Sequence, residues 1–170
     1  QRFIKKTVNF DDPSTYHLYY ADYRGTPGTV LTFFPWPHMK RGTRGTGEAG
    51  AFAYSTSPNS LDYWRQRLAA HELDVTESER FAETVLAFND PDGLVVELIT
   101  NEGMDVDIWE DSPVPAEHQL RGFHSITMNV NRADASVALL SEHLGLTAAS
   151  QVEESGDVRY RYQLPSGQVV

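Results

Sequence analysis

Two stretches of the chain repeat one order of expected elements, and this repeat constrains the fold more than any single motif does. Residues 50–100 and residues 122–170 each read as a strand, a helix and then three further strands. In both stretches a short polar turn separates the first strand from the helix, and a glycine (Gly93, Gly167) precedes the last strand. The repeat predicts an α+β fold made of βαβββ modules, whose sheets form open, incomplete β-barrel halves.

An incomplete copy of the same module comes before these two. Residues 2–34 read as three strands, over 2–8, 15–21 and 29–34, without a leading strand and helix. The chain begins at Gln1 and stops at Val170 inside what reads as a strand, so we expect a fragment of a longer protein. The expected division is a partial module of strands only at 1–36, a complete module at 48–100, a linker at 101–120, and a module truncated in its last strand at 121–170.

Helices are expected at two places. In residues 57–73 the period changes from two to about 3.6, and one face of the helix collects Leu61, Trp64, Leu68 and Ala69. A second helix is expected over residues 132–146, where Gly145 stops it. Strands are expected over 50–56 and 122–130. A hairpin of residues 80–89 and 94–100 is expected around the turn Asp90-Pro91-Asp92-Gly93.

The charge and residue content exclude several classes of partner and site. A formal net charge of −10 opposes binding to nucleic acid and to anionic membranes. The chain has no cysteine, so a metal would need His, Asp or Glu ligands, which favour divalent iron, manganese, zinc or nickel. With no signal peptide and no apolar run of about 18 residues, a cytoplasmic location is expected.

Two strand motifs carry a resemblance to a known superfamily. "DPDGLVVELI" (90–99) resembles the last-strand motif of the vicinal oxygen chelate superfamily, and "GFHSITMNV" (122–130) resembles its first-strand motif. That superfamily includes glyoxalase I, bleomycin-resistance proteins and extradiol dioxygenases. The resemblance implies that two modules pair around a cavity with a divalent metal, whose ligands lie on the first and last strands.

A narrower resemblance covers nearly the whole chain. "RFIKKTVNFDDPSTYHLYYAD" (2–22), "GTPGTVLTFFPWP" (25–37), "SLDYWRQRL" (60–68) and "RGFHSIT" (121–127) are similar to bacterial dioxygenases that open the rings of hydroquinones. This implies a metal-dependent, extradiol-type ring-cleaving dioxygenase with Fe(II), or alternatively Mn, Zn or Ni. The implied partners are a small aromatic diol and O₂, and a homo-oligomer is left open.

The same resemblance implies that catalytic residues lie outside these 170 residues. In those dioxygenases the iron is held by a His of the first of four modules and by a His and a Glu of the last, and none of these matches a position here. We therefore expect this stretch alone to show little or no activity and to hold no tight metal. Two other functions stay open: a glyoxalase-like isomerase or lyase, and a non-catalytic small-molecule binding protein.

Glu97 and His124 are the candidate metal ligands. Glu97 shares a strand face with Val95 and Ile99, where a carboxylate is costly unless it is paired or metal-bound. It matches the superfamily's last-strand ligand, and His124 matches the first-strand ligand. The alternatives are a water-facing Glu97 or a Glu97 paired with an arginine, together with a hydrogen-bonded core His124.

Four residues of the first partial module are candidates for binding the aromatic substrate. His17 and Tyr19 share one face of the strand 15–21, and Thr32 and Phe34 lie on the strand 29–34. Imidazole and phenol groups suit recognition of a diol by hydrogen bonding and ring stacking. The alternative is ordinary packing of side chains on the face of a sheet.

Overall fold

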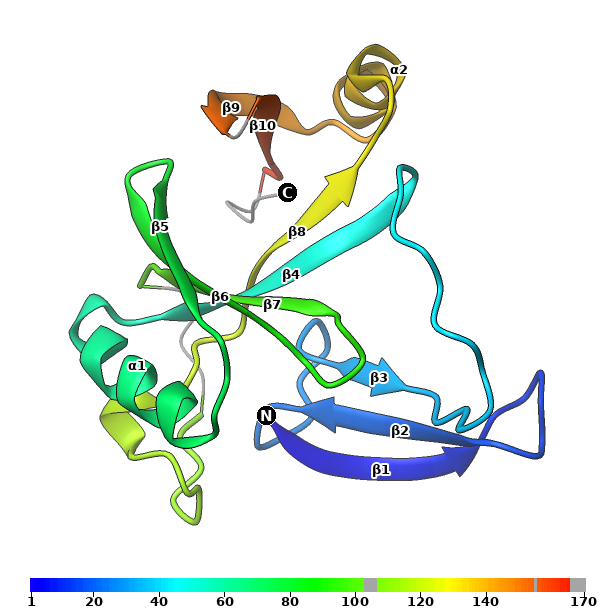
Figure 1. Ribbon diagram of the computed structural model, residues 1–170, viewed down its shortest axis with the longest axis vertical. Helices are drawn as coiled ribbons and strands as arrows, with labels where there is room; N and C mark the ends of the chain where they lie inside the picture. The colour runs from blue at the N-terminus through cyan, green and yellow to red at the C-terminus, as the bar shows by residue number, and fades with distance from the viewer. Residues whose placement is uncertain (103–106, 155, 166–170) are drawn as a thin grey trace.

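The computed structural model describes residues 1–102, 107–154 and 156–165. These residues form three sheets that follow one another along the molecule (Figure 1). A three-stranded sheet lies at one end, a five-stranded sheet occupies the middle, and a two-stranded hairpin with a helix lies at the other end. The α+β class is confirmed, and each sheet is open rather than closed into a barrel.

The first sheet is an antiparallel meander of three strands. These are β1 (Arg2–Val8), β2 (Tyr16–Ala21) and β3 (Leu31–Phe33). Strand β3 is shorter than the predicted 29–34 because the Thr29 N–H donates to the Thr26 carbonyl in a turn, at 3.1 Å. At the other end Pro35 has no N–H for a strand ladder.

The central sheet has the strand order β5-β6-β7-β4-β8. Strand β4 pairs with β7 in parallel and with β8 in an antiparallel direction, so β4 joins the predicted module 48–100 to the start of the next one. Helix α1 connects β4 to β5. The bounds are β4 (Glu48–Thr56), α1 (Leu61–Ala70), β5 (Thr76–Arg80), β6 (Glu83–Asn89), β7 (Val95–Thr100) and β8 (Phe123–Asn129).

The hairpin of β5 and β6 differs from the prediction, which placed a single strand over 80–89. Residues Phe81 and Ala82 form a two-residue turn with φ of 54° and 61°, and Arg80 pairs with Glu83 across it. A turn with two positive φ angles favours Asn and Gly, and a left-handed conformation costs other residues about 1–2 kcal/mol each. The sequence carries no such turn signal here, which is why no bounds were predicted for β5, the first of the three strands expected after the helix.

Each face of the central sheet buries its own cluster. Helix α1 covers one face, where Trp64 and Leu68 pack against Tyr54, Leu86 and Leu98. The opposite face buries a smaller cluster of Ala53, Val85 and Ile99. This alternation along β7 agrees with the predicted division of its side chains between two faces, because successive residues of a strand point to opposite sides.

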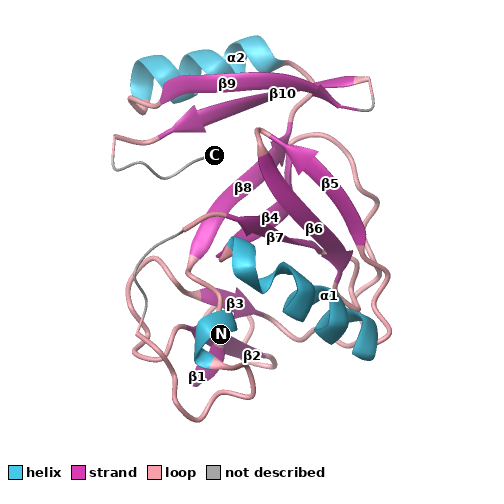
Figure 2. Ribbon diagram, turned by 90° about the vertical axis from the view of Figure 1, so that its left-hand side faces the viewer, coloured by secondary structure: helices cyan, strands magenta, loops and turns pink. Residues whose placement is uncertain are grey.

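The last described elements form a separate unit of helix and hairpin. Helix α2 (Ala133–Ala138) continues into a wider π-helical segment, η3 (Leu139–His143), and lies along the hairpin of β9 (Thr147–Glu154) and β10 (Asp157–Gln163), as Figure 2 shows. The helix predicted over 132–146 is therefore shorter and changes its winding. The predicted third strand, with Gly167, lies outside the described residues.

The described part of the predicted linker is folded against the central module. The Gln119 side chain accepts from the Trp109 N–H and donates to the Trp109 and Val114 carbonyls, at 2.9–3.2 Å. The ring of His118 stacks on Tyr63 of α1. Two short 3₁₀ turns flank this contact, η1 (Pro58–Ser60) and η2 (Ala116–His118). None of the described helices is long and apolar enough to cross a membrane.

Candidate functional site

A cleft of about 770 Å³ opens between the central sheet and the β9–β10 hairpin. Its walls combine apolar side chains of β8, such as Ile126 and Met128, with charged and polar groups from β5, β6, β8, β9 and β10. The polar lining includes Arg80, His124 and Arg161. The cleft therefore collects side chains from both predicted modules, as expected if the two modules pair.

Glu97 is buried and is paired with an arginine. Arg80, the last residue of β5, donates from Nη2 to Glu97 Oε2 at 2.6 Å. Arg80 is 8% exposed and Glu97 is 5% exposed, so water screens this ion pair little. Arg80 also lies 3.8 Å from Glu154 of β9, through its Nη1. The structure thus gives Glu97 the arginine partner that was one of its two expected alternatives.

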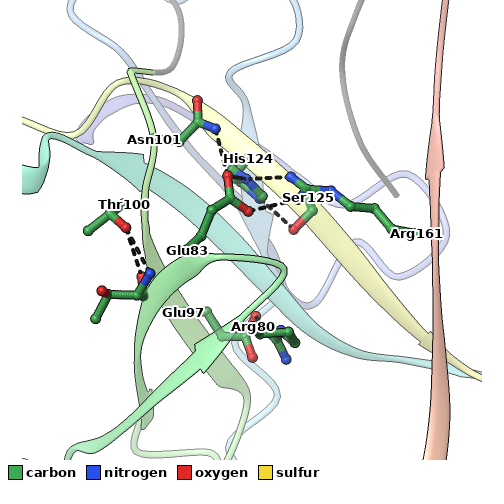
Figure 3. A network of polar contacts seen from close by, with 9 residues as sticks. Arg80, Glu83, Glu97, Thr100, Asn101, His124, Ser125 and Arg161 are labelled. Atoms are coloured by element: carbon green, nitrogen blue, oxygen red, sulfur yellow. Dashed lines mark hydrogen bonds and ion pairs between the residues drawn. The ribbon is translucent and has the colours of Figure 1, made fainter. Parts of the chain in front are cut away.

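His124 belongs to a second group of polar contacts, drawn in Figure 3. Its Nε2 lies 3.3 Å from Oε1 of Glu83, and its Nδ1 lies 2.9 Å from the Ser125 hydroxyl. Glu83 also accepts from Asn101 at 2.7 Å and pairs with Arg161 of β10 at 2.9 Å. His124 Nε2 faces both the Glu83 carboxylate, which only accepts, and Nη2 of Arg161 at 3.4 Å, which only donates, so these contacts do not select one tautomer of His124.

The surroundings of these groups determine which forms are charged. Burial lowers the pKa of His124, and the neighbouring Glu83 carboxylate only partly opposes this effect. Burial alone would raise the pKa of Glu83, but hydrogen bonds from Asn101 and Arg161 and the nearby His124 outweigh it and lower that pKa. A neutral His124 beside an ionised Glu83 is therefore the state at neutral pH.

The β9–β10 hairpin contacts the central sheet through charges at this cleft. Arg161 of β10 pairs with Glu83, and its guanidinium lies 5.3 Å from the ring centroid of Phe81 in the strained turn. Glu154 of β9 faces Arg80, as described above. Among the described residues the hairpin forms its own two-stranded sheet, so side chains rather than backbone ladders join it to the rest.

The described residues do not fit a metal centre. Glu97 is held by Arg80 and His124 by Glu83 and Ser125, so the two predicted ligands have separate partners. In the described ranges no group of three or more His, Asp or Glu could hold a metal ion. The metal-binding role of Glu97 and His124 stays a prediction that their contacts do not support.

Sequence reasoning missed Arg80, Glu83 and Arg161 as members of the site. One signal was available for Arg161. It alternates with Arg159 in "VRYRYQL", so two arginines share one face of a strand, a face on which charge needs partners. For Arg80 the strand "TESER" gave no apolar alternation from which a face could be assigned, and Glu83 begins the next strand, "ETVLAFN".

The four predicted substrate-binding residues lie together on one face of the first sheet. Tyr19 pairs with Thr32 across β2 and β3, and its hydroxyl lies 2.8 Å from Nδ1 of His17. The His17 ring stacks on Tyr19 at a centroid distance of 4.0 Å and lies 4.1 Å from Phe34. Phe34 in turn stacks on Trp36 at 5.2 Å. The side chains are half-buried and form a nearly continuous aromatic surface.

Curated proteins similar to this chain are named as dioxygenases. The chain is 36% identical over 170 residues to the "Putative ring-cleaving dioxygenase MhqO" of Bacillus subtilis (strain 168), covering 99% of this chain and 54% of that protein. It is 37% identical over 137 residues to the chlorohydroquinone/hydroquinone 1,2-dioxygenase of Sphingobium indicum, covering 78% of this chain and 43% of that enzyme. The chain spans about half the length of the curated relatives it matches.

A solved structure agrees with this similarity. The crystal structure of a "putative dioxygenase" from Bacillus subtilis subsp. subtilis str. 168 superposes with a TM-score of 0.87 at 35% identity, over 99% of this chain and 54% of that one. No protein-family model matches the chain. Sequence and fold agree over nearly the whole chain, which therefore belongs to the family of these ring-cleaving dioxygenases.

Proposed function

We propose that the chain forms part of a metal-dependent, extradiol-type dioxygenase that cleaves the ring of hydroquinone- or catechol-like aromatics. The observation that carries the proposal is the 37% identity to a chlorohydroquinone/hydroquinone 1,2-dioxygenase over 78% of this chain. The substrates would be a small aromatic diol and O₂. Fe(II) is the proposed metal, with Mn, Zn and Ni as alternatives.

The aromatic face of the first sheet is the proposed contact for the diol ring. Phe34 and Tyr19 offer flat surfaces for stacking, and Tyr19 and His17 form a hydrogen-bonded pair beside them. Small-molecule sites commonly combine apolar walls with a few placed polar groups. Thr32, opposite Tyr19 in the register, adds a hydroxyl to the same face.

The metal ligands are proposed to lie outside residues 1–170, because the contacts of Glu97 and His124 do not fit a metal centre. No step of the ring cleavage is therefore assigned to the residues that line the cleft between the central sheet and the β9–β10 hairpin. In this proposal the central module and the β9–β10 hairpin form a metal-free pair, in which Arg80 supplies the positive charge that faces Glu97.

A hybrid protein tests the proposal. The matching segment of the Sphingobium indicum dioxygenase would be replaced by this chain, and oxygen uptake with hydroquinone would be measured after loading with ferrous iron. We expect uptake by the hybrid and none by the 170-residue chain alone. A folded, iron-loaded hybrid that consumes no oxygen with any diphenol would exclude the proposed reaction, and uptake by the chain alone would show that it contains the ligands.

Direct binding provides a second measurement that does not depend on the hybrid. Hydroquinone is titrated into the 170-residue chain, and the amide resonances of β2 and β3 are followed by NMR. Shifts that disappear in His17→Ala, and that persist in the matched surface variant His71→Ala on the far end of α1, would support the proposed contact. Equal shifts in both variants would contradict it.

A further inference from the structure

We propose that a second, smaller cleft binds an aromatic monocarboxylate. This cleft has a volume of about 280 Å³ and lies where the first sheet meets helix α1 and the segment 107–122. It shares no lining residue with the larger cleft. Its size suits a ligand with a single ring. The aromatic part of its lining consists of Tyr23, Tyr54, Trp64 and Trp109.

Two guanidinium groups that have no carboxylate partner among the described residues border the small cleft. Arg2 lies over the rings of Tyr23 and Trp109, with centroid distances of 5.2 and 5.6 Å. Arg67 donates to the Tyr63 hydroxyl at 3.3 Å. Neither arginine forms an ion pair with a described residue, whereas most other arginines of the chain do. In a chain with a net charge of −10, two guanidiniums beside one cleft that form no ion pair within the described part of the chain indicate an anion-binding site.

The acidic groups of the small cleft already have partners. Asp107 Oδ2 pairs with the Arg24 guanidinium at 2.7 Å, and Asp22 Oδ1 accepts from the Thr26 N–H at 2.8 Å. These contacts direct the two carboxylates toward groups other than Arg2 and Arg67. An incoming carboxylate could therefore pair with the guanidiniums of Arg2 and Arg67, because guanidiniums bind carboxylates through paired N–H donors.

The aromatic lining decides which carboxylate fits. The rings of Trp64 and Tyr54 belong to the core between the central sheet and helix α1, and the backbone of Trp109 is held by two hydrogen bonds with the Gln119 side chain. Fixed ring faces favour a flat apolar ligand that stacks against them or meets them edge to face. A single aromatic ring that carries one carboxylate combines both requirements, so benzoate is the simplest probe.

The test is a titration of the 170-residue chain with three probes that separate ring from charge. Benzoate has both, benzyl alcohol has the ring without the charge, and acetate has the charge without the ring. Binding is measured by calorimetry and by quenching of tryptophan fluorescence. We expect benzoate to bind at least tenfold more tightly than either of the others. The proposal is overturned if benzyl alcohol binds as tightly as benzoate. It is also overturned if benzoate does not bind at 10 mM, a concentration on the order of the weakest specific dissociation constants.

Two arginine variants and one control localise the binding. Arg67→Met and Arg2→Met each keep an apolar stem and remove a guanidinium, and each should weaken benzoate binding about tenfold, the typical effect of losing one charge-assisted pair. Arg132→Met, far from the cleft and exposed, should leave binding unchanged. Circular dichroism checks that each variant folds. Because Arg2 lies on the edge strand β1, Arg2→Met tests the site without changing helix α1. Loss of affinity in the control alone, or in none of the three, overturns the proposal.

Discussion

The larger cleft and the aromatic face of the first sheet hold their polar groups in opposite ways. In the cleft, charged side chains such as Arg80 and Glu97 are almost fully buried and each depends on a partner of opposite charge. On the first sheet, aromatic rings such as His17 and Tyr19 are half-buried and contact one another through stacking. The cleft should therefore be sensitive to the loss of one member, and the aromatic face should tolerate it.

The largest effect is expected for Arg80→Ala. This change leaves the Glu97 carboxylate buried at the centre of the sheet without its partner, and breaking a buried ion pair in this way costs about 3–5 kcal/mol. Urea unfolding followed by circular dichroism at pH 7 measures the loss. The double variant Arg80→Met with Glu97→Leu should regain most of it, because a buried pair can often be replaced by apolar groups. Wild-type stability in Arg80→Ala would show that water reaches Glu97.

The strand that carries Glu97 could be predicted from the sequence, but the identity of its arginine partner could not. The strand of Glu97 was predicted correctly, because apolar alternation and the Asp90-Pro91-Asp92-Gly93 turn both act locally. Its partner depends on the register of β5 against β6, which places Arg80 opposite Glu83, with β6 lying between β5 and β7. That register is set by the turn at Phe81 and Ala82, which has no local signal.

The aromatic face shows the opposite case. His17 and Tyr19 were placed on one face from strand periodicity alone, and in the structure the other two candidates, Thr32 and Phe34, lie on that same face. This succeeded because β2 and β3 are neighbours in sequence and joined by a short connection. The His17–Tyr19 hydrogen bond also lies within one strand. Contacts at long separation, such as that of Arg161 with Glu83, carry no comparable signal.

The next largest effect is expected for Arg161→Met. The change removes the ion pair with Glu83 and the contact with the Phe81 ring, and should lower the free energy of unfolding by about 2–3 kcal/mol, the cost of hydrogen bonds to charged groups. Hydrogen exchange should show faster exchange in β9 and β10 than in β4 and β7. The exposed Arg132→Met serves as the control, with a change within about 0.5 kcal/mol. Uniform exchange changes in all strands would contradict charge-based anchoring of the hairpin.

A smaller effect is expected from acidification. The pKa of His124 is lowered in the folded state, so the unfolded chain takes up a proton first as the pH falls below 6.5, and stability is lost from there downward. The lowered pKa of Glu83 adds a further loss at lower pH, as this carboxylate is protonated. The urea midpoint should fall between pH 7 and pH 5, and His124→Gln should flatten this dependence. An unchanged slope in His124→Gln would assign the effect to other groups.

The smallest effect is expected for Tyr19→Phe on the aromatic face. The variant keeps the ring that stacks on His17 and removes only the hydroxyl that lies 2.8 Å from its Nδ1. Because the pair is half-exposed, water can replace the lost contact, and the cost should be about 0.5–1.5 kcal/mol. A loss as large as that of Arg80→Ala would mean that the aromatic face depends on each partner as the cleft does. A small loss with weaker hydroquinone binding would instead indicate that the Tyr19 hydroxyl serves recognition more than folding.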